Sequence, residues 1–337
     1  MLKKHRFQKI NTITIGAVLL LILVGSIVRS LGAGMGCPDW PKCFGAYIPP
    51  SSAEELPENY LDIFREQRLR KNVRLANTFS LLGNSELAYK ISNDPMVLVE
   101  QEFNVTKAWI EYINRLVGVV IGLLVFANMI FSFSCWKEEK KLTFVAIGIF
   151  VLTGFQGWVG SLVVSTNLLH GFITFHMILA LLILALLIWL NVKLKAAVAH
   201  PTPRLFIVSL TSLLIFIPQV ILGTEVRGVV DDLIMNETDR SSWMNAVEVG
   251  SFYIHRSFSW IILLSSLAIT YMIHKMSLTD LKPYGYLLVI LVLVGMFAGI
   301  GMVKFNFPYW MQPLHLIVAT GIFSLLFYLT LQTKFSS

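Results

Sequence analysis

Histidines inside apolar segments are the residues of this chain with the clearest chemical meaning. Three of its 7 histidines, His176, His255 and His315, lie shortly after the expected start of such a segment, and Asn114 holds the equivalent position in another. Ionisable groups are costly to bury in a membrane, so they indicate a function there by default. A lone histidine often only hydrogen-bonds a neighbouring helix. Three at matched depth favour ligation instead.

Two imidazoles on facing helices suit the axial positions of a haem held in a four-helix bundle. His255 and His315 make such a pair in the C-terminal half, whereas the N-terminal half offers Asn114 and His176. An amide is a poor iron ligand beside imidazole, so this half is expected to leave one haem face open or weakly held. Zinc is less favoured, because it needs several ligands around one ion, often cysteine or carboxylate.

A carboxylate stands beside the position of the missing histidine. Glu111 precedes Asn114 by one helical turn, whereas the matching residue of the second half is Phe252. A buried carboxylate at an open haem face is suited to take or relay protons. The alternative is an ion pair between Glu111 and Arg115, which are spaced i, i+4 near the membrane surface.

Arginines recur at the ends of apolar segments on the same side as the histidines. They are Arg29, Arg115, Arg227 and Arg256. A guanidinium binds a carboxylate through two parallel hydrogen bonds, so we expect these residues to contact haem propionates. Arginines that simply reach from a helix end to the membrane surface are the alternative.

Two cysteines bracket the stretch CPDWPKC directly after the first apolar segment. The short, proline-containing spacing favours a closed loop, and disulfides persist on the oxidising side of a bacterial membrane. We therefore expect a disulfide between Cys37 and Cys43. The spacing is not that of a CxxC redox motif, and zinc would need further ligands. The sequence favours neither a structural nor an electron-exchanging role for this disulfide.

The elements that must position these residues are long apolar segments. The chain is 55% hydrophobic and only 14% charged, with a mean hydropathy of +0.69, which is typical of a multi-span membrane protein. Each segment is long enough to cross about 30 Å of hydrocarbon as a helix. The expected spans are 10–30, 108–134, 142–164, 172–192, 205–223, 251–272, 283–303 and 312–332.

The order of the motifs indicates an internal duplication. The matches are GSIVRS (25–30) with GTEVRG (223–228), YINR (112–115) with YIHR (253–256), and HMILA (176–180) with HLIVA (315–319). We therefore predict an all-α polytopic membrane protein whose eight transmembrane helices form two pseudo-symmetric four-helix bundles. The N-terminal unit is expected over 1–198, with a long loop at 31–107, and the C-terminal unit over 199–337.

The net charge of +7 comes largely from short basic connections on one side of the expected spans. The positive-inside rule then puts both termini in the cytoplasm and the loops 31–107 and 224–250 in the periplasm. The first segment is long enough to span and lacks a clean cleavage site, so a retained helix in a bacterial inner membrane is expected. Residues 51–107 show helical spacing and are expected to lie over the first unit. Nucleic-acid binding is excluded, because no recognition motif accompanies the charge.

These motifs resemble the heme A synthase family over essentially all of the expected helices. GAGMGCPDWPKCFG is similar to the family's first external loop, EYINR to its Glu-x-x-His-Arg segment, and FHMILA, YIHR and PLHLIVA to its other histidine segments. The resemblance implies an oxidoreductase that acts on a methyl group and converts heme O to heme A for haem–copper oxidases. The C8 methyl of the porphyrin becomes a formyl group through two successive hydroxylations and loss of water.

The resemblance also implies which residues act in each half. His255 and His315 would bind a permanent heme B, while His176 would face the substrate heme O and Glu111 would be the catalytic carboxylate. The family usually has histidine where this chain has Asn114. It often has a second cysteine pair in the loop after the fifth span, which this chain lacks. Expected partners are the farnesyltransferase that makes heme O, oxidase assembly factors, membrane lipid and a second copy of the chain.

Two other classes of protein compete with this interpretation. A b-type cytochrome that transfers electrons without altering its haem would explain the histidine pair, and a haem-delivery or oxidase-assembly factor would bind haem without turnover. Simple electron transfer needs neither Glu111, nor the missing ligand, nor the cysteine loop. These three features favour the synthase.

Overall fold

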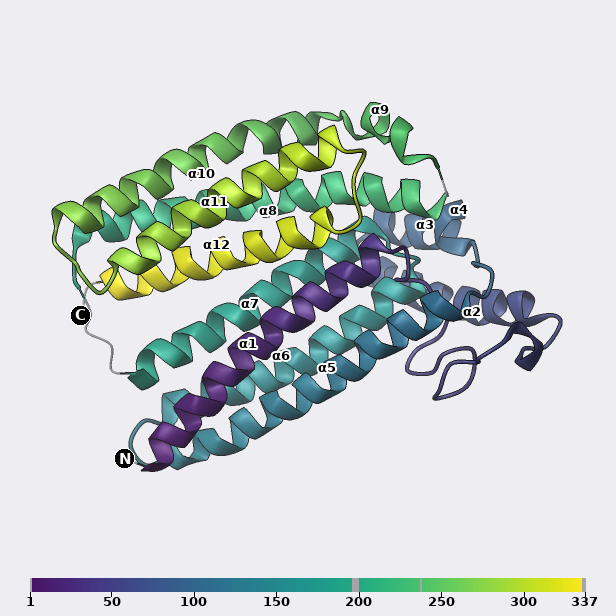
Figure 1. Cartoon of the computed structure of the whole chain (residues 1–337). Coiled ribbons are helices and arrows are strands. Elements are labelled where there is room, and N and C mark those ends of the chain that lie inside the picture. Colours follow the sequence, from purple (N-terminus) through teal and green to yellow (C-terminus); the bar gives the residue numbers. More distant parts are fainter. Residues whose placement is uncertain (1, 196–199, 237, 335–337) are drawn as a thin grey trace.

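The computed structural model describes residues 2–195, 200–236 and 238–334 (Figure 1). Within them, eight helices are long and apolar enough to cross a membrane, which confirms the expected all-α membrane fold. They are α1 (Leu2–Ser30), α5 (Val105–Ser132), α6 (Lys140–Ser165), α7 (His170–Lys195), α8 (Pro203–Met235), α10 (Gly250–Lys275), α11 (Lys282–Lys304) and α12 (Met311–Thr333). Continuous apolar runs adopt helices because hydrocarbon offers the backbone no other hydrogen-bond partners.

Local signals set where several of these helices begin. The side chain of Asn104 accepts a hydrogen bond from the backbone N–H of Lys107 and so caps α5. Proline lies in the first turn of α8 and of α11, where its missing N–H costs no helical hydrogen bond. The starts of these helices therefore follow from short-range sequence.

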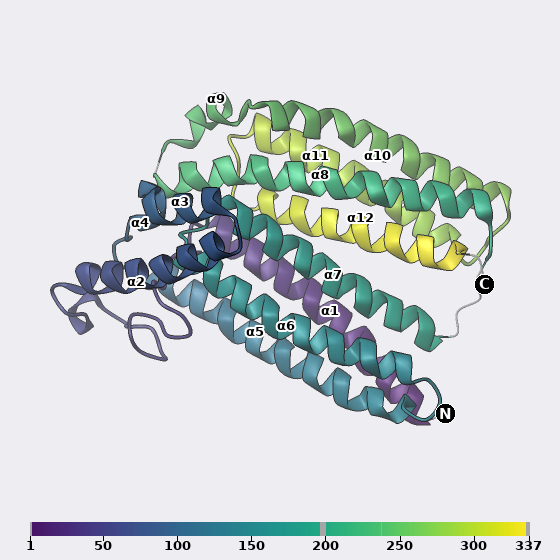
Figure 2. The ribbon, with the colours of Figure 1, turned by 180° about the vertical axis from the view of Figure 1, so that it is seen from behind.

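The long helices pack as two groups of four. In one group, α1, α5, α6 and α7 surround a core that includes Leu142, Leu184 and Leu187. In the other, α8, α10, α11 and α12 surround a core that includes Ile269 and Leu326. The groups lie side by side and touch mainly through α12 against α1 and α7 (Figures 1 and 2). That a symmetry axis relates them stays a prediction, and the expected boundary at 198–199 lies outside the described residues.

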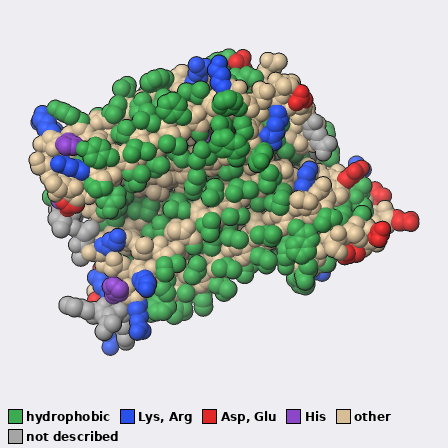
Figure 3. Space-filling model, in the orientation of Figure 1, with side chains coloured by type: hydrophobic (Ala, Val, Ile, Leu, Met, Phe, Trp, Pro, Cys, Tyr) green, Lys and Arg blue, Asp and Glu red, His purple; other side chains and the backbone are tan. Residues whose placement is uncertain are grey.

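The two ends of the bundle differ in character. Both chain termini lie at one end, and the long connections gather at the other, which we call the loop end (Figure 1). Hydrophobic side chains cover much of the long side of the molecule, whereas acidic side chains gather at the tip of the loop end (Figure 3). An apolar long side suits contact with lipid. Which side of a membrane each end faces stays a prediction.

Helix α8 is longer than the sequence predicted. The expected span ended at 223 and was followed by a loop from 224, but α8 continues to Met235. The fall in hydropathy after Gly223 is not a helix end, because Arg227 and Asp231 form an ion pair at i, i+4 within the extension. Val230 also packs into an apolar cluster with Trp243 of the following loop. The prediction of a loop over 224–235 was therefore wrong.

The connection after α1 folds into a helical cap, defined here as residues 31–104. It contains α2 (Tyr60–Leu81), α3 (Ser85–Asn93) and α4 (Pro95–Leu98), so the helical spacing seen in 51–107 is confirmed. Arg68 of α2 is buried, and its Nη2 donates to Glu100 at 2.9 Å. Its Nη1 donates to the carbonyl of Val164 at 2.9 Å, in the last turn of α6. A buried charge needs such partners, so these bonds fasten the cap to the N-terminal group.

Candidate functional site

A pair of histidines lies in the C-terminal group, near the starts of α10 and α12 at the loop end. His255 of α10 and His315 of α12 have ring centres 6.1 Å apart. The Nδ1 atom of His255 lies 3.1 Å from the carbonyl oxygen of Gln219, and that of His315 lies 2.9 Å from the carbonyl oxygen of Gly295. A carbonyl only accepts, so both Nδ1 atoms donate. Each imidazole therefore keeps its Nε2 lone pair free for a ligand.

The spacing of this pair fits axial ligation of one iron. A bond between a metal and an imidazole nitrogen is about 2 Å long, so two imidazoles on opposite sides of one ion have ring centres about 6 Å apart. Metal-binding histidines usually donate their other N–H to a carbonyl or carboxylate, as both rings do here. The residues present therefore suit a bis-histidine haem such as heme B.

Each of the four expected ligand positions packs against a glycine of the preceding spanning helix. A Cβ atom added to each glycine would lie close to the facing side chain. The pairs, with the distance from that added Cβ to the nearest atom of the side chain, are Gly25 with Asn114 (4.0 Å), Gly160 with His176 (3.4 Å), Gly223 with His255 (3.1 Å) and Gly299 with His315 (3.6 Å). Only glycine leaves the closest of these rings room to lie against the helix backbone. Sequence reasoning missed this pattern, although Gly25 and Gly223 both open the repeated motif, which lies in the last turns of α1 and inside α8.

The N-terminal group carries one imidazole where the C-terminal group carries two. Asn114 lies on α5 and His176 on α7, and both helices belong to the same group. The Oδ1 atom of Asn114 and the Nδ1 atom of His176 are buried, and neither has a hydrogen-bond partner among the described residues. Buried polar atoms without partners are rare and indicate a place for a ligand or water. The chemistry of this donor set suits a haem with one axial imidazole.

Glu111 holds the cysteine loop, residues 37–43, against the loop end of α5. Its side chain is only about 5% exposed and forms the ion pair with Arg115 that was the alternative interpretation of this residue. Its Oε2 atom also accepts a hydrogen bond from the backbone N–H of Cys37 at 2.8 Å. Cys37 and Cys43 form a disulfide, as expected from the sequence. A catalytic role for Glu111 stays a prediction.

Arg115 completes the attachment of the cysteine loop. Its Nη1 atom donates to the carbonyl oxygens of Asp39 at 2.9 Å and Lys42 at 2.7 Å. These charge-assisted bonds reach the backbone on both sides of the loop. Arg115 therefore positions the loop that covers α5.

The other repeated arginines lie in different surroundings. Arg29 of α1 and Arg227 of α8 both pair with Asp231, where the two groups of helices meet. Asp231 itself was missed, because the sequence placed it in a loop. Arg256 is exposed on α10. Contacts of the four arginines with haem propionates stay predictions.

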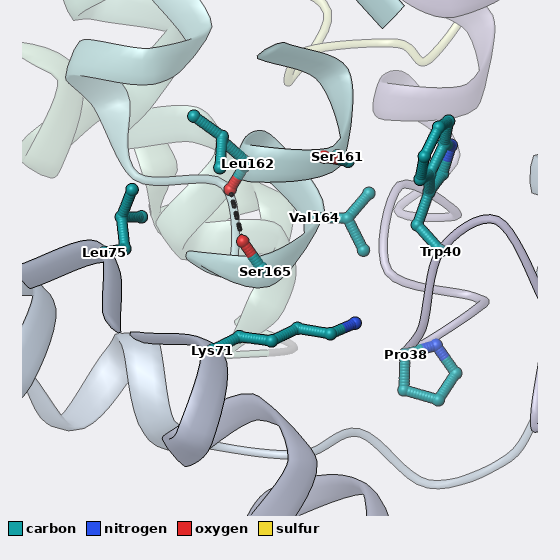
Figure 4. A pocket seen from close by; sticks show the side chains of 8 residues that line it. All are labelled: Pro38, Trp40, Lys71, Leu75, Ser161, Leu162, Val164 and Ser165. Atoms are coloured by element: carbon teal, nitrogen blue, oxygen red, sulfur yellow. Dashed lines mark hydrogen bonds between the residues drawn. The ribbon is translucent and has the colours of Figure 1, made fainter. Parts of the chain in front are cut away.

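Two cavities lie at the loop end. The larger, of about 490 Å³, is lined by Arg29 and Asp231 together with Lys107 and parts of the cap. The smaller, of about 160 Å³, lies between the cysteine loop, α2 and the end of α6 (Figure 4). Lys71 extends across it from α2, while Trp40 lines the opposite wall. Its α6 wall begins at Ser161, directly after the glycine that faces His176.

Comparison with known proteins supports the resemblance seen in the motifs. The family model for COX15-CtaA, described as cytochrome oxidase assembly protein, matches residues 8–78 and 84–327. The chain is 28% identical over 215 residues to a heme A synthase of Shewanella oneidensis; the match covers 63% of this chain and 54% of that protein. It is 26% identical over 292 residues to a heme A synthase of Rhizobium meliloti, covering 84% of this chain and 70% of that protein.

A third relative, a heme A synthase of Pelagibacter ubique, is 24% identical over 295 residues, which are 80% of each chain. The chain thus spans only about half the length of some of these relatives, such as the one from Shewanella oneidensis at 54%. The family match nevertheless extends across all eight long helices.

Replacement of Arg115 by alanine should loosen the cysteine loop. A hydrogen bond to a charged group contributes about 1.5–3 kcal/mol, so loss of these bonds should speed attack on the disulfide at least about tenfold. The rate is measured by reduction with a phosphine and labelling of Cys37 and Cys43 with a maleimide. Arg256→Ala is the matched control, because exposed Arg256 holds the position in α10 that corresponds to Arg115 in α5. This variant should leave the rate of disulfide reduction unchanged. Equal rates for both variants would show that Arg115 does not hold the loop.

Proposed function

Because the chain belongs to the COX15-CtaA family of cytochrome oxidase assembly proteins, we propose that it is a heme A synthase. Its substrate is heme O and its product heme A, for use in haem–copper oxidases. The observation that carries the proposal is the difference between the two groups of helices. One group presents two imidazoles with fixed Nδ1 atoms, and the other presents His176 with Asn114 in place of a second imidazole.

In this proposal His255 and His315 hold a permanent heme B. The hydrogen bonds from their Nδ1 atoms to main-chain carbonyls fix the tautomer and the orientation of both rings. Such bonds also raise the basicity of the nitrogen that faces the iron, which favours firm binding. Heme B, when bound, supplies electron transfer to or from the substrate half.

In the N-terminal group, His176 binds the iron of heme O and Asn114 leaves the opposite face weakly held. A substrate haem must enter, react and leave, and a single axial imidazole permits that. The C8 methyl is oxidised by two successive hydroxylations, and loss of water from the resulting carbon leaves the formyl group. The oxygen and the electron acceptor come from outside the chain.

Glu111 is the proposed catalytic carboxylate, which takes or relays protons beside Asn114. Its bonds to Arg115 and to the N–H of Cys37 hold the carboxylate in one place, one helical turn from Asn114. The cysteine loop then serves as a wall of the substrate site. Arg29, Arg115, Arg227 and Arg256 are the proposed propionate contacts.

We further propose a bacterial inner membrane location with both termini in the cytoplasm. The long apolar helices and the basic short connections support it. The loop end would then lie in the periplasm, where the disulfide is stable. Direct transfer of heme O from the farnesyltransferase that makes it would keep an apolar, reactive molecule out of solution.

Haem extracted from the purified protein, co-expressed with a source of heme O, tests the proposed function. We expect heme B together with heme A or a hydroxylated heme O, identified by chromatography and mass spectrometry. His176→Ala should retain heme B and lose the derivatives of heme O. Heme B alone, at two per chain, would overturn the proposal in favour of an electron-transfer cytochrome.

Replacement of Asn114 by histidine restores the residue usual in the family and tests the role of the open face. We expect heme A production at or below the level of the unchanged chain, because a second imidazole holds the substrate haem more firmly. The measurement is the yield of heme A together with its rate of release to apomyoglobin. Higher yield with faster release would contradict the role given to Asn114.

A further inference from the structure

Two glutamines, the half-buried Gln156 and the buried Gln219, contact the main chain of one histidine in each group of helices. Gln156 of α6 donates its side-chain Nε2–H to the carbonyl oxygen of His176 at 3.0 Å. Gln219 of α8 donates in the same way to the carbonyl oxygen of His255 at 2.8 Å. A carbonyl oxygen only accepts, so each amide must present its nitrogen, and this orientation is unambiguous.

The glutamines and the facing glycines form one structural unit. Gln156 precedes Gly160 by four residues, and Gln219 precedes Gly223 by four residues. Residues at this spacing lie on the same face of a helix, so the glutamine and the glycine meet the histidine together. The glycine gives the ring room, and the glutamine fixes the main chain that carries the ring. We call this unit the glutamine clamp.

The two clamps do not descend from the internal repeat. The residue of α1 that corresponds to Gln219 is Leu21, four residues before Gly25, and the residue of α11 that corresponds to Gln156 is Gly295. Gln156 contacts α7, the fourth long helix of its group, whereas Gln219 contacts α10, the second long helix of its group. Each group has one clamped histidine, and in the N-terminal group this is its only ligating imidazole. Each group therefore has one histidine whose main chain is held by a glutamine side chain.

The clamps differ at the Nδ1 atom of the histidine ring. In the C-terminal group, the main-chain carbonyl of Gln219 accepts from Nδ1 of His255, so main chain and ring are both held. In the N-terminal group, Nδ1 of His176 is buried and has no hydrogen-bond partner among the described residues. A ligating imidazole without that bond is less basic and binds metal more weakly.

We infer that Gln156 and Gln219 are positioning residues that set the strength of one axial histidine in each half. Gln219 fixes both the main chain and the ring of His255, which makes a permanent ligand. Gln156 fixes only the main chain of His176, which makes an exchangeable one. The inference rests on the proposed function for the identity of the two haems. It adds a physical reason why one haem stays and the other turns over.

Methionine at each position tests the inference, because it keeps the length of glutamine and removes the donor. The haem-loaded protein is compared by electron paramagnetic resonance and by the rate of haem transfer to excess apomyoglobin. Gln219→Met should shift the resonance of heme B and release heme B about tenfold faster. Gln156→Met should leave heme B unchanged and release heme O about tenfold faster.

Asn11→Leu is the matched control. Asn11 of α1 is fully buried, and its amide donates to the carbonyl of Leu187 on α7 at 3.0 Å, a bond of the same kind. Leu187 lies about 16 Å along α7 from His176, which is too far to affect the iron site. This variant should therefore change neither the resonance nor the release of either haem.

The inference is overturned if both methionine variants match the Asn11→Leu protein in resonance and in haem release. Should Gln219→Met fail to accumulate, Gln219→Leu also removes the donor with a different apolar side chain, and the same two readouts apply. A chain that binds haem in both halves but yields no heme A would refute the proposed function alone. The release rates would still decide whether the clamps act.

Discussion

The contact between each ligand position and a glycine of the preceding helix is the feature on which the site depends. Helices in hydrocarbon satisfy their own backbone, so a buried imidazole must find its second partner on a neighbouring helix. The glycines bring that helix close enough for its carbonyls to reach Nδ1 of His255 and His315. Because Nδ1 donates to these carbonyls, the Nε2 lone pair of each ring stays available for a ligand. The facing glycines therefore account both for the close packing of the helices and for the orientation of the two imidazoles.

Two similar groups of helices differ in a few side chains, to which the proposed function assigns different chemistry. Both groups have the facing glycines, but the N-terminal group has Asn114 where the other has His255. Among the residues that the structure describes, Nδ1 of His176 also has no hydrogen-bond partner. The N-terminal group also has Glu111, where the matching residue of the other group is Phe252. Arg115 and the cysteine loop hold the carboxylate of Glu111 in place. The groups meet at the loop end through Asp231, which binds an arginine from each. The two groups that would hold the two haems are thus joined by these ion pairs.

The sequence predicted the features that depend on local composition. The eight spans and the disulfide follow from apolar runs and cysteine spacing. Helix α8 exceeded its apolar run because an ion pair and contacts with Trp243 extend it, and neither shows in a hydropathy profile. The roles of Gln156 and Gln219 depend on which helices become neighbours. Glutamine inside an apolar run was visible, but its partner was not.

Binding of carbon monoxide by the reduced, haem-loaded protein tests the central claim most directly. Carbon monoxide binds haem iron only where an axial position is open or weakly held. The account predicts that half of the haem binds carbon monoxide, and that Asn114→His abolishes this binding while heme B is unaffected. Binding by none of the haem, or by all of it, would contradict a firm bis-histidine site beside an open one.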